Sequence, residues 1–188
     1  MSKHEEALAV LRRAMENERE GYRFYLEASE RSADAAGQGT FRSLARDEER
    51  HLAILLVEHD SLVAGKGWVD PEEALARQVE VDITKPLFPG EKLASQEKSP
   101  FEETWAAYDV GPLEGDLAVL KFGMNVEEKF YQMYQQAAAE TDDAVGRQAY
   151  QFLMKEENRH FRLLQDAHSY LSDNKHWWDA WELPFFEG

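Results

Sequence analysis

The sequence contains no cysteine among its 188 residues. It can therefore form no disulfide bond, thiolate nucleophile, tetrathiolate iron site, iron–sulfur cluster or thiolate zinc site. Any metal ion that this chain binds must be held by oxygen and nitrogen atoms.

Long apolar runs and an excess of basic residues are also missing. No stretch of about 18 apolar residues is present, and the opening MSKHEEALAV lacks the apolar core of a secretory signal. Lys and Arg total 21 against 37 Asp and Glu, a formal charge of −16. Such a charge argues against nucleic acid and anionic membranes as partners. We expect a soluble, cytoplasmic protein that binds neither.

Apolar side chains recur every three or four residues along four long segments, which is typical of amphipathic helices. We predict helices over residues 4–34, 40–65, 112–140 and 143–171. Gly37 and Gly39 are expected to break the chain between the first two helices, and Gly65 and Gly67 to end the second.

The remaining residues are predicted to join and follow these helices. Residues 66–111 hold four of the six prolines and indicate a long crossover with one or two short helices, one of them beginning near Ser99. Residues 174–188 form an aromatic tail with Trp177, Trp178, Trp181, Phe185 and Phe186. Docking of this tail onto the bundle is preferred over a subunit interface. Helical hairpins over 4–65 and 112–172, the crossover and the tail then make one domain, residues 1–188.

The two halves of the chain are similar to each other. One constant shift in numbering, which carries Leu8 onto Leu117 and is called the duplication offset below, superposes the first two predicted helices on the last two without a gap. The same offset pairs Met15, Tyr22 and Ala28 with Met124, Tyr131 and Ala137. A general similarity between helices does not predict one fixed offset that tyrosines and histidines share, so we infer an internal duplication.

Each half carries the same acidic and imidazole pattern. A lone glutamate precedes a Glu-x-x-His sequence by the same distance in both halves; the residues are Glu18, Glu48 and His51 in the first half and Glu127, Glu157 and His160 in the second. A single Glu-x-x-His is more often an exposed helical pair than a metal site. Its repetition in register favours the metal site.

Helical geometry explains what this pattern can do. Residues three apart lie on nearly the same side of a helix, so one carboxylate and one imidazole can bind a single ion. Two facing hairpins would bring four carboxylates and two imidazoles to a common centre. That centre would be costly without cations, because buried carboxylates repel one another. Two divalent ions would balance the charge, and this ligand set suits iron or manganese, with zinc possible.

The segments ENEREGYRFY, LARDEERH, VEEKFYQMY and MKEENRH resemble the ferritin-like diiron family and, more narrowly, its rubrerythrin-like branch. The resemblance covers about residues 4–65 and 112–172. It implies an all-α, ferritin-like four-helix bundle of two duplicated hairpins, with a long crossover between the second and third helices. It also implies two iron ions, with Glu18 and Glu127 as terminal ligands, Glu48 and Glu157 as bridging carboxylates, and His51 and His160 as one imidazole per metal.

Two departures from the rubrerythrin pattern are visible. Rubrerythrins usually carry a further glutamate three residues after the lone glutamate of the third helix, and that position is Phe130 here. They also usually carry a cysteine-ligated rubredoxin domain, which a chain without cysteine cannot form. The remaining ligand set is more similar to that of bacterioferritins, and electrons would have to come from an external donor protein.

Three functions are compatible with these features. The resemblance implies reduction of hydrogen peroxide to water at a diiron site. A ferroxidase, which oxidises Fe(II) with dioxygen and passes iron onward or stores it, is the second possibility. The third is a non-enzymatic metal-binding helical module whose tail or crossover docks a partner. A homodimer is expected, and exchange of hairpins between its chains stays open because a long crossover permits swapping.

Other polar residues are assigned roles from their positions relative to the predicted ligands. A buried tyrosine more commonly fills the core with its hydroxyl satisfied. Tyr25 and Tyr134 are the preferred candidates to contact the site and assist catalysis, because each lies seven residues beyond a lone glutamate on the same helical face. Asp47 and Glu156 each precede a predicted bridging glutamate; a solvated surface position is preferred over contact with the histidines. The four remaining histidines are predicted to lie on the surface; they are His4, His59, His168 and His176.

Overall fold

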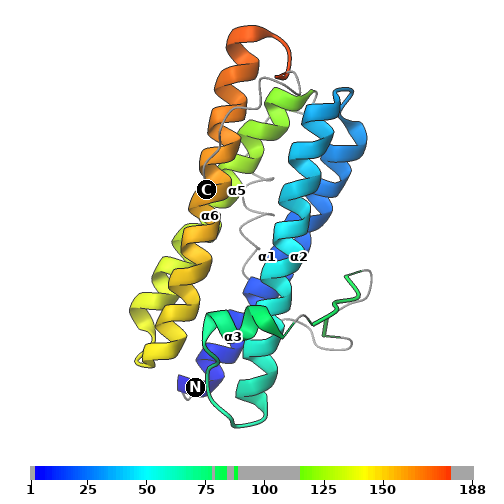
Figure 1. Cartoon of the computed structure of the whole chain (residues 1–188). Helices are drawn as coiled ribbons and strands as arrows, with labels where there is room; N and C mark the ends of the chain where they lie inside the picture. Colours follow the sequence, from blue (N-terminus) through cyan, green and yellow to red (C-terminus); the bar gives the residue numbers. More distant parts are fainter. Residues whose placement is uncertain (1–2, 78, 84–86, 89–114, 179–188) are drawn as a thin grey trace.

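The computed structural model describes residues 3–77, 79–83, 87–88 and 115–178, and these residues form five helices (Figure 1). The helices are α1 (Lys3–Arg31), α2 (Ala35–Val63), α3 (Pro71–Ala76), α5 (Asp116–Glu140) and α6 (Ala144–Asn174). Among the described residues, no helix has the length and apolar character that a membrane span requires.

The four long helices pair as two hairpins, α1 with α2 and α5 with α6, which lie side by side in Figure 1. Each helix turns an apolar face inward, and the shared core contains Leu11, Leu44, Leu120 and Leu164, none of them exposed. The chain thus forms the ferritin-like helical bundle that the sequence predicts. The short helix α3 lies in the predicted crossover, whereas the helix start expected near Ser99 lies outside the described residues.

The start of α2 differs from the prediction. Asp34 caps this helix, because its side chain accepts a hydrogen bond from the Ala36 backbone at 2.8 Å. The helix therefore begins at Ala35, and Gly37 and Gly39 lie inside its first turns instead of breaking the chain. Asp143 caps α6 in the same way, and the duplication offset relates the two caps.

Gly37 is a contact point between the hairpins and not a turn residue. A Cβ atom built on Gly37 would lie 2.8 Å from the Trp177 ring, and one built on Gly146 would lie 2.6 Å from the Trp68 ring. The duplication offset relates these two pairs as well. Each tryptophan follows one hairpin and packs against the other. The duplication therefore includes a pair of equivalent contacts between the hairpins.

The tail begins by docking onto the bundle, as the preferred interpretation expects. Trp177 and Trp178 are buried, and the Trp177 indole donates a hydrogen bond to Asp116 at 2.6 Å. The other tail aromatics, Trp181, Phe185 and Phe186, lie outside the described residues.

His59 was expected on the surface, and that prediction is wrong. It is 7% exposed, its Nε2 accepts a hydrogen bond from Arg12 at 3.2 Å, and its ring lies 5.3 Å from the ring of Phe88. Phe88 belongs to the predicted crossover, and its ring lies against the imidazole. Periodicity within one helix cannot predict a cover that comes from a distant segment.

Glu58 is a buried carboxyl group that holds the segment after α2. It is 1% exposed, and one of its oxygens accepts a hydrogen bond from the Val69 backbone at 2.9 Å. Burial raises the pKa of Glu58 from 4.5 to about 7, although the Val69 hydrogen bond and the charge of Arg77 oppose the rise. The folded chain therefore favours the protonated form.

Replacement of two nearby glycines of α2 by alanine should change the free energy of unfolding in opposite directions. Gly37→Ala should lower the free energy of unfolding by about 1–3 kcal/mol, because the new methyl group overlaps the Ser32 hydroxyl and the Trp177 ring. Gly39→Ala should raise it by about 0.5–1 kcal/mol, because nothing lies near its Cβ position. Urea unfolding of both variants checks this, and a stabilising Gly37→Ala would contradict the tryptophan contact.

Replacement of Glu58 should change how stability depends on pH. A folded pKa above the unfolded value gives stability that is present below about pH 4.5 and lost as pH rises through about 7. Glu58→Gln keeps an acceptor for Val69 but cannot ionise. The difference in unfolding free energy between variant and wild type should therefore grow in favour of the variant by roughly 2 kcal/mol between pH 5 and pH 8. Urea unfolding across this range measures it, and a constant difference would contradict the raised pKa.

Candidate metal centre

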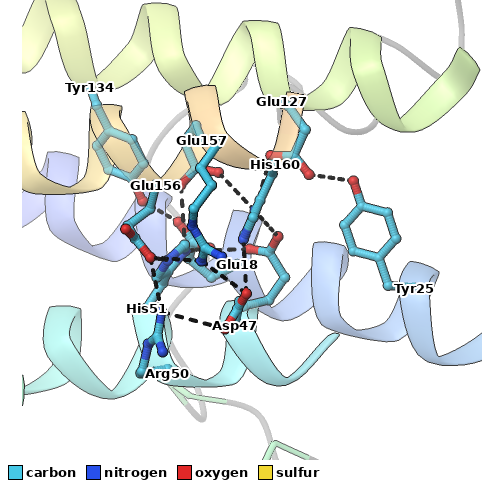
Figure 2. Close-up of polar contacts among 12 residues, drawn as sticks. Glu18, Tyr25, Asp47, Arg50, His51, Glu127, Tyr134, Glu156, Glu157 and His160 are labelled. Carbon is cyan, nitrogen blue, oxygen red and sulfur yellow. Dashed lines mark hydrogen bonds and ion pairs between the residues drawn. The ribbon is translucent and has the colours of Figure 1, made fainter. Parts of the chain in front are cut away.

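The six side chains that the duplicated pattern singles out meet at the centre of the bundle (Figure 2). Each long helix contributes, with Glu18 from α1, Glu48 and His51 from α2, Glu127 from α5, and Glu157 and His160 from α6. All six have 0% exposure. The sequence of one chain supplies all six residues of the cluster.

Three carboxylates surround the Nδ1 atom of His51. Its nearest carboxylate oxygens are Oε2 of Glu18 at 3.4 Å, Oε1 of Glu157 at 3.5 Å and Oε2 of Glu48 at 3.8 Å. One of the three comes from the same helix turn and one from the opposite hairpin.

The Nδ1 atom of His160 has the matching environment. Its neighbours are Oε1 of Glu48 at 3.2 Å, Oε2 of Glu127 at 3.7 Å and Oε2 of Glu157 at 3.7 Å. Glu48 and Glu157 thus present one oxygen to each imidazole, whereas each lone glutamate faces only one. The two rings stack with centroids 5.3 Å apart.

The buried tyrosines connect the hairpins. The hydroxyl of Tyr25 donates a hydrogen bond to Oε1 of Glu127, and the hydroxyl of Tyr134 donates one to Oε1 of Glu18. Both tyrosines thus contact a predicted ligand, and each one bonds the glutamate of the opposite hairpin. Burial raises the pKa of both phenols well above its ordinary value, so both stay protonated donors.

Sequence analysis preferred a solvated surface position for Asp47 and Glu156. In the structure both carboxylates lie beside the histidines of the site. Oδ2 of Asp47 lies 3.4 Å from Nε2 of His160, and Oε2 of Glu156 lies 3.6 Å from Nε2 of His51. Each carboxylate thus faces the outer nitrogen of the histidine on the opposite hairpin. The duplication offset also pairs Asp47 with Glu156, and this was the available signal.

Two arginines complete this outer layer. Arg50 lies 2.9 Å from Glu156, and Arg159 lies 3.0 Å from Asp47. Contact with His51 lowers the pKa of Glu156 to about 2 against the effect of burial. Burial acts to raise the pKa of Asp47, but His160 and the arginines lower it to about 2. Both carboxylates therefore stay charged over the histidines.

The buried charges perturb one another. Burial and the adjacent Glu48 raise the pKa of Glu18 to about 8. Burial also raises the pKa of Glu157, and the surrounding carboxylates add to that rise. For the two histidines burial acts to lower the pKa, but the facing carboxylates outweigh it and raise the pKa well above its ordinary value. By itself, then, the cluster balances its charge by holding protons.

The unpartnered polar atoms show what the cluster fits. Both carboxylate oxygens of Glu48 and of Glu157, and Oε2 of Glu18 and of Glu127, are buried without a hydrogen-bond partner. One ligand atom from each of Glu48, His51, Glu157 and His160 lies within 4.8 Å of the others. Oxygen and nitrogen atoms gathered at this spacing form the kind of ligand set that a divalent metal ion requires. The cluster can therefore bind metal.

Two equivalent positions beside the lone glutamates carry different residues. Phe130 has 0% exposure and brings an apolar ring where rubrerythrins would carry a further carboxylate. The duplication offset places Gly21 at the equivalent position of α1. A Cβ atom on Gly21 would lie 3.3 Å from Cδ of Glu48, so the glycine lets the α1 backbone approach that carboxylate.

Two helical hairpins that enclose four carboxylates and two imidazoles define the class of ferritin-like carboxylate–histidine metal proteins. Comparison with known proteins gives the narrower identity. The family model described as Rubrerythrin matches residues 9–168, and the chain belongs to the rubrerythrin family. No curated protein and no solved structure matches the chain.

Neutralisation of Glu157 should affect the metal-free and metal-loaded protein in opposite directions. Glu157→Gln removes a desolvated carboxyl group, so it should stabilise the metal-free protein by on the order of 1 kcal/mol. Divalent metal should stabilise the wild type by about 4 kcal/mol at a thousand-fold excess over Kd, and the variant by less than half of that. Thermal unfolding with and without Fe(II), Mn(II) or Zn(II) measures both effects.

Glu49, an exposed residue of α2 that follows Glu48 in the sequence, provides the control. Glu49→Gln changes the charge equally but should leave the metal-dependent stabilisation intact. A Glu157→Gln variant that keeps the full metal-dependent shift would exclude Glu157 from metal binding.

Proposed function

We propose that this protein is a non-haem diiron oxidoreductase that reduces hydrogen peroxide to water. The observation that carries the proposal is the pair of equivalent environments around the two imidazoles, which share Glu48 and Glu157. Membership of the rubrerythrin family supports the choice of iron.

The ligand roles follow from which oxygen faces which nitrogen. Glu18 and His51 would hold one iron, and Glu127 and His160 the other. Glu48 and Glu157 would bridge the two, because each offers an oxygen to both imidazoles. Two Fe(II) ions held by these residues would supply the two electrons needed to cleave the O–O bond of a peroxide.

Surrounding side chains orient these ligands. Tyr25 and Tyr134 each occupy Oε1 of a lone glutamate, which leaves Oε2 turned toward the imidazole Nδ1 and free for a metal ion. Asp47 and Glu156 stay ionised beside the Nε2 atoms, so Nε2 keeps its proton and Nδ1 is the nitrogen that would give up its proton to bind metal. The protein therefore presents the ligand atoms in one arrangement before metal arrives.

Turnover needs electrons from outside the chain. Each peroxide consumes two electrons and two protons to give two waters, and a chain without cysteine cannot carry a thiolate-ligated iron centre of its own. We propose an external electron-donor protein that restores the reduced centre after each peroxide.

One observation favours ferroxidase activity as the second candidate. Phe130 is apolar and buried, so the chain lacks the further glutamate of rubrerythrins and keeps the four-glutamate, two-histidine set that resembles bacterioferritins. Under this alternative the same ligands would oxidise Fe(II) with dioxygen in place of peroxide.

The choice of oxidant tests the proposal. Protein loaded with Fe(II) under anaerobic conditions should bind about two irons per chain, and stopped-flow absorption should show oxidation by peroxide at least about tenfold faster than by oxygen. Faster oxidation by dioxygen would establish the ferroxidase, and absence of bound metal would leave a non-enzymatic interaction module.

A matched pair of variants links the activity to the centre. Glu127→Ala should lower peroxide turnover by at least about a hundredfold because one iron loses its terminal carboxylate. Glu128→Ala changes the adjacent exposed position and should keep wild-type turnover. Unchanged turnover in Glu127→Ala, with helix content preserved by circular dichroism, would reject the proposed mechanism.

A further inference from the structure

A line of aromatic rings leads from the metal centre to the end of the bundle. Tyr134 donates its hydroxyl hydrogen bond to Glu18, and its ring stacks against the ring of Tyr150 with centroids 6.4 Å apart. The ring of Tyr150 meets the indole of Trp68 edge-on, with centroids 5.2 Å apart. Each ring of the line is therefore paired directly with the next.

The outer end of this line reaches a cavity. Trp68 and Tyr150 both line a cavity of about 500 Å³, together with His4, Glu140 and Asp142. The cavity lies where the start of α1 meets the loop between α5 and α6. The indole of Trp68 is half-buried, so the line ends where an external molecule can approach.

The duplication supplies a second line that is interrupted. The duplication offset carries Tyr25, Phe41 and Trp68 onto Tyr134, Tyr150 and Trp177. In the second line Trp177 packs against Phe41 with centroids 5.9 Å apart, and Tyr25 bonds Glu127. Phenylalanine has no phenol and loses an electron far less readily than tyrosine or tryptophan. Of these two lines, the one through Tyr150 is therefore built from oxidisable rings throughout.

We propose that Trp68, Tyr150 and Tyr134 form a one-electron relay between the cavity and the metal centre. The proposal rests on the proposed function, because the relay serves a centre that peroxide has oxidised. The relay gives an external one-electron donor a route to a cluster that has no exposed atoms of its own.

Each transfer through the relay balances. Tyr134 would pass one electron to the centre while its hydroxyl proton moves along the hydrogen bond to Glu18. When Tyr150 supplies an electron, the proton returns from Glu18 to Tyr134. Tyr150 releases its phenol proton to water in the cavity and regains it when Trp68 reduces it. An external one-electron donor then reduces Trp68. The net result is one electron from the donor to the centre, and two such transfers accompany each peroxide.

A purely structural role for these rings predicts a different outcome. If the aromatic side chains only fill the core, oxidation after peroxide treatment should not depend on the metal centre. The symmetry-related Trp177 is the internal reference, and metal-free protein gives the background that exposure alone produces. The informative quantity is the metal-dependent increase in oxidation at each tryptophan.

The experiment treats Fe(II)-loaded protein with several equivalents of hydrogen peroxide per centre in the absence of any donor. The two Fe(II) ions supply the electrons for the first equivalent, so further peroxide must take its electrons from side chains, and peptide mass spectrometry measures oxidation of Trp68 and Trp177. Wild-type protein should show a metal-dependent increase at Trp68 at least about fivefold larger than at Trp177. Tyr150→Phe, which copies the interrupted line, should reduce the increase at Trp68 to the level at Trp177. Phe41→Tyr, which completes the second line, should raise the increase at Trp177.

The outcomes separate this inference from the proposed function. Equal increases at both tryptophans in wild type, or an increase at Trp68 that Tyr150→Phe leaves unchanged, would overturn the relay while peroxide consumption by the loaded protein stays normal. Failure of the proposed function would instead be seen as absence of peroxide consumption. Iron content and helix content of Tyr150→Phe, which loses a single hydroxyl group, should match the wild type.

Discussion

Six ionisable side chains lie without solvent contact in the middle of an apolar bundle, and the surrounding structure is arranged to tolerate them. Carboxylates at this density cannot all remain charged without a counter-charge, so the cluster either holds protons or holds cations. The tyrosine hydroxyls satisfy one oxygen of each lone glutamate, and the ionised Asp47 and Glu156 face the outer histidine nitrogens. What remains unsatisfied is the inner set of acceptor atoms, which is the part that a metal ion can satisfy.

The pseudo-twofold symmetry of the bundle places the supporting contacts between the hairpins as well as within them. Tyr25 bonds a glutamate of the second hairpin, and Tyr134 bonds one of the first. Trp68, which follows the first hairpin, packs against Gly146 of the second, and Trp177, which follows the second hairpin, packs against Gly37 of the first. The hydroxyl that bonds each lone glutamate comes from the other hairpin, so the surroundings of the centre are complete only when the two halves are docked.

The symmetry is broken at positions that surround the centre. Gly21 and Phe130 occupy equivalent positions beside the lone glutamates, and Phe41 and Tyr150 occupy equivalent positions outside the buried tyrosines. The centre itself is nearly symmetric, whereas its connections to the ends of the bundle are not. A duplicated chain can thus keep a symmetric ligand set while the residues around that set differ between its two halves.

The sequence alone determined the helices, the duplication and the six clustered residues, because these depend on periodicity, a fixed offset and i, i+3 spacing. It could not determine that Asp47 and Glu156 face the histidines, that Phe88 covers His59, or that Gly37 receives Trp177. Those contacts join segments far apart in the chain, and a helical pattern specifies which face is apolar without specifying what packs against it. The tertiary structure alone decided which carboxylate oxygen faces which imidazole, because that depends on how the two hairpins dock.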